Sequence, residues 1–269
     1  MQPRVMGVLN VTPDSFSDGG CFERLDQAVD HAARLILEGA EVLDIGGEST
    51  RPGAQATTQN AELERVLPVI SALRARFATP LSIDTRKPAV ARAAVAAGAS
   101  LWNDVSGLSG HAESLTTAAA LGCDVVLMHM QGEPATMQRA PTYADVVSEV
   151  RDWLLERARQ AMAAGIARER IWLDPGLGFG KTAAHNLALV KSLGSLTQLG
   201  FPVLLGASRK GLIRAVDPTA VDPGDRLGGS LALALAGVRA GCAMLRVHDV
   251  RATVQALKLE RAISAAVIA

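Results

Sequence analysis

Eight short apolar runs recur along this chain, and a helix-like stretch follows each of them. The runs are Val5 to Leu9, Glu41 to Ile45, Pro80 to Asp84, Ala99 to Asn103, Asp124 to Met128, Arg170 to Leu173, Pro202 to Leu205 and Ala243 to Val247. Most are almost continuously apolar, which is typical of parallel strands that are covered on both faces. The pattern therefore predicts eight buried parallel strands.

The stretches between the runs have helical spacing. In Tyr143 to Ala164, one helical face carries Val146, Val150, Leu154, Ala158 and Ala161. Strand and helix alternate eight times in 269 residues, close to the usual size of a (β/α)8 barrel. We therefore predict an α/β fold, a single (β/α)8 TIM barrel over residues 1–269, in preference to a doubly wound open sheet. The clearest loop signal lies at Asp217 to Asp225, between the seventh strand and its helix.

Composition narrows the class of protein. A hydrophobic content of 49% permits a large core, and 27 basic against 27 acidic residues leave no net field for nucleic acid or anionic membranes. No apolar run approaches a membrane span, and Met1 to Arg4 contain no signal-peptide core. We expect a cytoplasmic enzyme without nucleic-acid or membrane partners. Three separated cysteines, Cys21, Cys123 and Cys242, are expected to be simple thiols.

Two loops after neighbouring strands are rich in oxygen ligands and turn residues. Asn10 to Gly20 is long for a strand-to-helix connection, and Gly46 to Gly53 has the same character. On adjacent strands of a barrel, both loops would meet over its carboxyl-terminal mouth. Each loop taken alone is explained equally well as a solvated turn with local caps.

Acceptor side chains close three of the strands. Asp84 ends the third run, Asn103 and Asp104 end the fourth, and Asp174 follows the sixth. Any single one is as readily a helix cap as a functional group. Three on one mouth suit a ligand with a planar, donor-rich edge, such as a pterin or guanine, although Arg or a metal competes for the same acceptors.

Cations follow the last two strands. Arg209 and Lys210 come after the seventh, and Arg246 and His248 lie at the end of the eighth. Residues two apart project to the same side of a strand, and the loops after strands 7 and 8 are a frequent phosphate site in barrels. We therefore expect an anion there. Alone, Lys210 reads as a surface lysine and His248 as a satisfied core histidine, and a buried lysine also permits Schiff-base chemistry.

Taken together, these segments resemble the dihydropteroate synthase family, the sulfonamide target of folate synthesis. The matching motifs run in order from the first strand to the eighth: Asn10 to Gly20, Asp44 to Gly53, Asp84-Thr85, Asn103-Asp104, Met128 to Gly132, Asp174 to Phe179, Ser208 to Lys210 and Arg246 to His248. The resemblance implies that 4-aminobenzoate displaces pyrophosphate from 6-hydroxymethyl-7,8-dihydropterin pyrophosphate to give 7,8-dihydropteroate. It also implies that the chain forms a homodimer.

The resemblance assigns roles to particular residues. The pterin would be held by Asp84, Asn103, Met128, Asp174, Phe179 and Lys210, and pyrophosphate by Asn10, Thr50, Arg51, Arg246 and His248. Asp84, Lys210, Arg246 and His248 would form the catalytic set. Mg²⁺ would be held by Asn10 and phosphate oxygens, with Asp18 completing its environment.

The aminobenzoate pocket would involve Phe16, Thr50, Pro52 and Gly211. Many relatives have Ser at the position of Gly211, so here only backbone N–H groups remain for the carboxylate. No insertion lies beside Phe16, and we expect ordinary sulfonamide sensitivity.

The chemistry requires no side-chain nucleophile, because an arylamine is already nucleophilic. We hypothesise a dissociative displacement in which Mg²⁺ and the strand-8 cations stabilise the leaving group and Asp84 favours positive charge on the pterin. Two alternatives are a pterin-binding methyltransferase, which should lack the paired loops and the Arg246-Val247-His248 site, and a non-catalytic folate-pathway scaffold, which should have lost Asn10, Lys210 or Arg246.

Overall fold

The predicted strands form one parallel sheet. The computed structural model describes residues 2–12, 21–49 and 56–266, with side chains from residue 25 onward in the second range. The strands are β1 (Arg4–Asn10), β2 (Val42–Gly46), β3 (Leu81–Asp84), β4 (Leu101–Asp104), β5 (Asp124–Met128), β6 (Ile171–Asp174), β7 (Leu204–Leu205) and β8 (Met244–Val247). All eight predicted runs therefore contain a strand, with ends shifted by a few residues.

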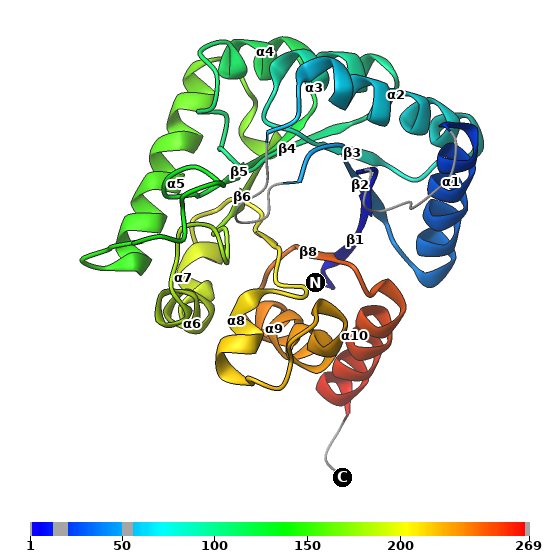
Figure 1. The fold of residues 1–269 in the computed structure, drawn as a ribbon. Coiled ribbons are helices and arrows are strands. Elements are labelled where there is room, and N and C mark those ends of the chain that lie inside the picture. The colour runs from blue at the N-terminus through cyan, green and yellow to red at the C-terminus, as the bar shows by residue number, and fades with distance from the viewer. Residues whose placement is uncertain (1, 13–20, 50–55, 267–269) are drawn as a thin grey trace.

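The sheet closes into a barrel. The strand order is β6-β5-β4-β3-β2-β1-β8-β7, all pairs are parallel, and a bridge between Leu173 and Val203 joins the two outer strands. Helices surround the ring of strands (Figure 1). The predicted TIM barrel is confirmed.

The helices pack their apolar faces on the outside of the strands. They are α1 (Cys21–Glu38), α2 (Gln59–Arg76), α3 (Pro88–Ala96), α4 (Ser114–Leu121), α5 (Val146–Ala163), α6 (Ala183–Lys191), α7 (Leu193–Thr197), α8 (Gly211–Val216), α9 (Leu227–Arg239) and α10 (Val250–Ala265), with short 3-10 turns η2 (Arg168–Arg170) and η3 (Pro223–Arg226). The five predicted core positions of α5 are all buried. The helix begins at Val146 because the Asp145 side chain caps it by accepting from the Val147 N–H.

The barrel interior explains where the functional side chains lie. A compact apolar layer fills its lower part, formed by Met6, Val42, Leu101, Val126, Trp172, Leu204 and Met244. Side chains two residues further along a strand point to the same side. Counting two residues from this layer gives Val8, Asp44, Asn103, Met128, Asp174, Gly206 and Arg246. The second layer is therefore polar and faces the carboxyl-terminal mouth.

Three smaller expectations can also be compared with the structure. The segment Asp217 to Asp225 precedes α9, as predicted, but the short helix α8 comes between β7 and this segment. Cys123 and Cys242 are buried free thiols. Within residues 2–12, 21–49 and 56–266, no helix combines the length and apolar character needed to cross a membrane.

Candidate active site

A cavity of about 1100 Å³ opens at the carboxyl-terminal mouth of the barrel. Its lining draws on segments that follow β1, β2, β5, β6, β7 and β8, and on the last residue of β3. Seven of the predicted site residues line it: Asn10, Asp84, Phe179, Lys210, Gly211, Arg246 and His248. The predicted groups for pterin and pyrophosphate therefore share one space.

Three other predicted residues are buried and do not belong to this lining. Asn103, Met128 and Asp174 are at most 5% exposed. A Cβ atom placed on Gly206 would lie 3.7 Å from the Asp174 Oδ2, so the missing side chain of Gly206 leaves this carboxylate open toward the cavity. The predictions for Phe16, Asp18, Thr50, Arg51 and Pro52 fall outside the described residues.

Arg246, whose side chain is 21% exposed, forms the centre of an ion-pair cluster with two buried carboxylates. Its Nε donates to the Asp44 Oδ2 at 2.5 Å, and its Nη2 donates to the Asp84 Oδ2 at 2.8 Å. The Asn103 amide also donates to the Asp44 Oδ2, at 3.0 Å. Two carboxylates share one guanidinium, so the cluster holds one more acidic group than basic groups.

This cluster retains acceptors for a ligand. The Asp44 Oδ1 and the Asp84 Oδ1 are buried and have no hydrogen-bond partner among the described residues. Burial raises the pKa of Asp84 to about 7, although the Arg246 guanidinium opposes the shift. A ligand that brings N–H donors or positive charge would satisfy these oxygens, because a buried unpaired acceptor is costly.

The β6 side of the cavity is arranged differently. The Asp174 Oδ1 accepts from the Gly176 N–H at 2.7 Å, and burial raises the pKa of Asp174. The Lys210 ammonium lies 4.7 Å from the centre of the Phe179 ring. Burial lowers the pKa of Lys210 to about 8, and Asp174 opposes this shift.

A strained backbone turn precedes Lys210. Arg209 has a φ of 57°, which is uncommon for a residue with a side chain. Its guanidinium pairs with Asp249 at 2.5 and 3.0 Å, and its backbone N–H donates to the Ser230 Oγ at 2.8 Å. These contacts hold the conformation that brings Lys210 to the cavity.

His248 is a neutral group at this site. Burial lowers its pKa to about 3, and the neighbouring cation Arg246 adds to the shift. The ring Nδ1 lies 3.0 Å from the Ser208 Oγ, and the His248 N–H donates to the same oxygen at 3.2 Å. At neutral pH, His248 therefore offers a ring hydrogen bond and no charge.

Asp104 is a turn cap and lies outside the cavity lining. Its carboxylate accepts from the N–H groups of Ser106 at 2.7 Å and Leu108 at 3.1 Å. Asp104 therefore has a local role, but it caps a turn and not the next helix, because α4 begins only at Ser114. Its neighbour Asn103 lies on the opposite side of the strand and faces Asp44.

Buried ion pairs also fix the base of the segment after β2. The Glu48 Oε1 accepts from the Thr57 N–H at 2.8 Å, while the Lys87 ammonium contacts Glu48 at 3.0 Å and Glu62 at 2.5 Å. Arg65 donates to the Gly47 carbonyl at 2.7 Å. These contacts tie residues on both sides of 50–55 to α2 and to the end of β3.

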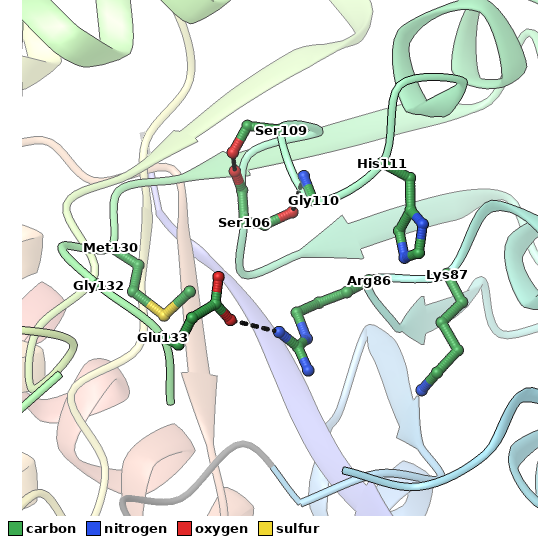
Figure 2. Close-up of a pocket in the computed structure, with 9 residues that line it drawn as sticks. All are labelled: Arg86, Lys87, Ser106, Ser109, Gly110, His111, Met130, Gly132 and Glu133. Carbon is green, nitrogen blue, oxygen red and sulfur yellow. Dashed lines mark hydrogen bonds and ion pairs between the residues drawn. The ribbon is translucent and has the colours of Figure 1, made fainter. Parts of the chain in front are cut away.

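A second, smaller pocket of about 260 Å³ is lined by Lys87 of these ion pairs and by Arg86 (Figure 2). It is formed by the segments after β3, β4 and β5. Its cation Arg86 pairs with Glu133 at 3.1 Å and lies 3.8 Å from Glu48, and Lys87 is paired as described above. Both cations of this pocket are therefore paired with carboxylates.

Comparison with known proteins identifies the family. The model of the pterin-binding enzyme family matches residues 6–248. Dihydropteroate synthase of Escherichia coli strain K12 is 47% identical over 260 residues, which cover 97% of this chain and 91% of that protein. This chain belongs to the dihydropteroate synthase family of pterin-binding enzymes.

Solved structures of this family share the fold. Dihydropteroate synthase of Xanthomonas albilineans with 4-aminobenzoic acid is 51% identical with a TM-score of 0.93, covering 99% of this chain and 94% of that chain. The enzyme from the same organism in complex with 7,8-dihydropteroate is 48% identical with a TM-score of 0.90, covering 99% and 95%. The family resemblance drawn from the sequence is therefore confirmed.

Sequence reasoning missed two buried groups at the site. Asp44 was part of a matched motif but received no role, although it lies two residues after Val42 of the interior layer. Lys181 was missed entirely, and it is only 2% exposed. A charged residue inside the apolar run Val42 to Ile45 was a usable signal for Asp44. Lys181 gave no such signal, because its partners are the backbone carbonyls of Gly176 and Phe179 nearby and His129, which is 52 residues away.

Proposed function

We propose that this chain joins 4-aminobenzoate to the methylene carbon of 6-hydroxymethyl-7,8-dihydropterin pyrophosphate. The amine nitrogen forms the new bond to carbon, the carbon–oxygen bond to pyrophosphate breaks, and the amine loses a proton. The products are 7,8-dihydropteroate and pyrophosphate. The observation that carries this proposal is the single cavity that combines the Asp84 carboxylate with Lys210, Arg246 and His248.

The pterin would lie against the second layer of the barrel. Its N–H groups would donate to Asp174 and to the unpaired oxygens of Asp44 and Asp84. Lys210 would donate to the acceptor side of the ring, and Met128 and Phe179 would supply apolar contact. The Arg246 guanidinium is held in a fixed plane by its two carboxylates, as a stacking surface for a flat ligand requires.

The residues around Asn10 fit Mg²⁺ held mainly through substrate phosphates. A Cβ atom on Gly46 would lie 3.7 Å from both the Asn10 Oδ1 and the Asp84 Oδ2, so the absent side chain leaves room for an ion beside oxygen donors. Asn10 would bind the ion, and Asp18 is the second proposed ligand. Bound Mg²⁺ neutralises charge on a leaving diphosphate.

The chain's own groups favour a dissociative displacement. Arg246, with the ring N–H of His248, would stabilise negative charge on the leaving oxygen. The carboxylate of Asp84 would stabilise positive charge that spreads from the methylene carbon into the dihydropterin ring. A secondary kinetic isotope effect well above unity at the methylene is expected, and a value near unity would argue against this path.

Aminobenzoate would bind at the outer part of the cavity. Gly211 is the first residue of α8 and lines the cavity, so its backbone N–H lies where a carboxylate would be favoured. Phe16, Thr50, Arg51 and Pro52 are proposed to complete the aminobenzoate and pyrophosphate sites. Sulfonamides would compete for the aminobenzoate position, and an inhibition constant for sulfamethoxazole far above the aminobenzoate KM would contradict this.

We further propose that the enzyme is a cytoplasmic homodimer that pairs through its last helices. The sequence of α10 has an apolar stripe of Val250, Val254 and Leu257, but the core largely explains it, because Val250 and Leu257 are buried. Leu259 and Ile263, one helical turn apart, are 61% and 62% exposed and form the candidate contact. Sedimentation analysis of the purified chain and of Leu259→Glu distinguishes dimer from monomer.

The central experiment is a coupled assay of pyrophosphate release by the purified chain, with both substrates and Mg²⁺. Release should require 4-aminobenzoate and should yield 7,8-dihydropteroate in equal amount. Lys210→Ala and Asp174→Asn should each lose most of the activity. Absence of turnover by a folded wild-type chain would refute the proposed reaction.

A further inference from the structure

A buried lysine without an ion-pair partner lies under the pterin side of the cavity. Lys181 follows the segment Pro175 to Gly180 and is only 2% exposed. Among the described residues, no carboxylate lies within 4.0 Å of its ammonium. A buried charge of this kind is costly, so its surroundings must compensate it.

Backbone carbonyls compensate the charge. The Lys181 Nζ donates to the carbonyl oxygens of Gly176 at 3.0 Å, Phe179 at 3.0 Å and His129 at 3.2 Å. It also lies 2.9 Å from the His129 Nδ1. An ammonium has three N–H groups for these four acceptors, so at least one N–H is shared. Burial lowers the pKa of Lys181 to about 7, although Asp174 opposes this shift. When Lys181 is protonated, the His129 Nδ1 accepts from it and the ring proton of a neutral His129 lies on Nε2. Burial, followed by Lys181, lowers the pKa of His129 to about 3, which agrees with a neutral ring.

The carbonyls that Lys181 gathers belong to the turn that carries the pterin groups. Asp174 precedes this turn and accepts from the N–H of Gly176, while Phe179 donates its N–H to the Gly176 carbonyl at 3.1 Å. The turn passes very close to the segment after β5. A Cβ atom on Gly176 would lie 2.0 Å from the His129 carbonyl oxygen, so only glycine fits there.

We propose that Lys181 is a positioning residue whose buried ammonium holds the turn after β6 in the shape that presents Asp174 and Phe179 to the pterin. This inference rests on the proposed function for the identity of the ligand. His129 supports Lys181, because it anchors the ammonium to the segment after β5. Lys181 and His129 have no other role in the proposed reaction.

The test compares Lys181→Met with the exposed control Lys191→Met on α6. Loss of the donor leaves several buried carbonyls unsatisfied, so the Kd for 6-hydroxymethyl-7,8-dihydropterin should rise about 10- to 100-fold in calorimetry. The KM for the pterin substrate should rise in parallel. The KM for aminobenzoate at saturating pterin should change less than about threefold, because Gly211 lies on a different turn. Lys191→Met should resemble the wild type.

A second pair of variants keeps the test decisive if Lys181→Met does not fold. In His129→Asn the side-chain oxygen can still accept from Lys181, whereas His129→Leu removes that acceptor. His129→Leu should weaken pterin binding several-fold more than His129→Asn does. Equal losses in the two His129 variants, or equal effects of Lys181→Met on both substrates, would overturn the inference.

The outcomes also separate this inference from the proposed reaction. A wild-type chain that binds the pterin but releases no pyrophosphate contradicts the reaction alone. Unchanged pterin affinity in folded Lys181→Met contradicts the role of Lys181 alone. A wild-type chain that binds no pterin contradicts both.

Discussion

The two sides of the cavity differ in whether their charged side chains have ion-pair partners. On the β2, β3 and β8 side, the Arg246 guanidinium is paired directly with Asp44 and Asp84. On the β6 and β7 side, neither Asp174 nor Lys210 has an ion-pair partner within 4.0 Å among the described residues. Backbone groups and an aromatic ring surround those charges.

The difference separates stability from binding. A paired buried cluster is costly to break, because removal of one partner leaves the others buried and uncompensated. An unpaired buried cation is costly to keep and becomes favourable when a ligand supplies the missing partner. The paired side should therefore stabilise the barrel, and the unpaired side should contribute mainly to ligand affinity.

The largest effect is expected from Arg246→Met. Loss of the guanidinium leaves Asp44 and Asp84 close together without a cation, and the free energy of unfolding should fall by about 3–5 kcal/mol. The value of kcat/KM should also fall by about 100-fold or more, because a cation for the leaving group is lost. Urea unfolding and the pyrophosphate assay measure the two effects.

A surface arginine provides the control for this variant. Arg239 pairs with Glu260 on the exposed face, and its side chain is 67% exposed. Arg239→Met should leave both stability and activity close to wild type. Adding Asp84→Asn to Arg246→Met should recover part of the lost stability, since it removes one of the two carboxylates. If the double variant recovers no stability, repulsion between the Asp44 and Asp84 carboxylates is not the cause of the loss.

Lys210→Met tests the other side of the comparison. Pterin affinity should fall about 100-fold, because a buried donor to the ligand is removed. The free energy of unfolding should stay unchanged or rise, because an unpaired, partly buried charge is also removed. Calorimetry and urea unfolding give the two values, with the exposed Lys258→Met as the matched control. A loss of stability as large as that of Arg246→Met would erase the distinction between the two sides.

The pH dependence of stability and binding should have opposite signs on the unpaired side. Burial lowers the pKa of Lys210 from 10.5 to about 8, while Asp174 and Asp84 oppose this shift and Arg246 adds to it. Between these values the unfolded chain binds more protons than the native chain, so this lysine makes stability rise with pH, by about 3 kcal/mol at most. Pterin affinity should fall over the same range as the ammonium is neutralised.

Comparison with Lys210→Met isolates this contribution from other groups. The difference in unfolding free energy between the wild type and the variant is measured at several pH values from 7 to 10.5. As the pH rises, the unfolding free energy of the wild type should increase relative to that of Lys210→Met. A difference that is independent of pH would show that Lys210 keeps its ordinary pKa in the folded chain.

Much of the site could be predicted because many of its residues lie at the carboxyl ends of strands. Apolar runs located the strands, and the two-residue period of a strand links the interior layer to Asn103, Asp174 and Arg246. The same count reaches Asp44 from Val42. Its partner Arg246 is 202 residues away, however, and nothing local in the sequence specifies that pairing.

The supporting contacts were harder to predict for a physical reason. Lys181 is compensated by carbonyl oxygens, which every residue has, so no residue type marks its partners. Glu48, Lys87 and Glu62 read as ordinary surface charges until three separate segments are brought together. Asp104 and Asn103 are adjacent, yet one caps a turn and the other faces the cavity, because successive side chains point to opposite faces.

The smallest effect is expected from Gly211→Ser on the unpaired side. In the part of the chain that the structure describes, no atom outside the adjoining backbone lies within 4 Å of a Cβ placed on Gly211, so a serine side chain displaces none of these residues. Its hydroxyl would lie at the first turn of α8 and donate to the aminobenzoate carboxylate, which should lower the aminobenzoate KM about two- to fivefold. The pterin KM and the stability should hardly change. Gly211→Ala, which has the Cβ without the hydroxyl, is the control, and an equal gain from alanine would assign the effect to backbone rigidity.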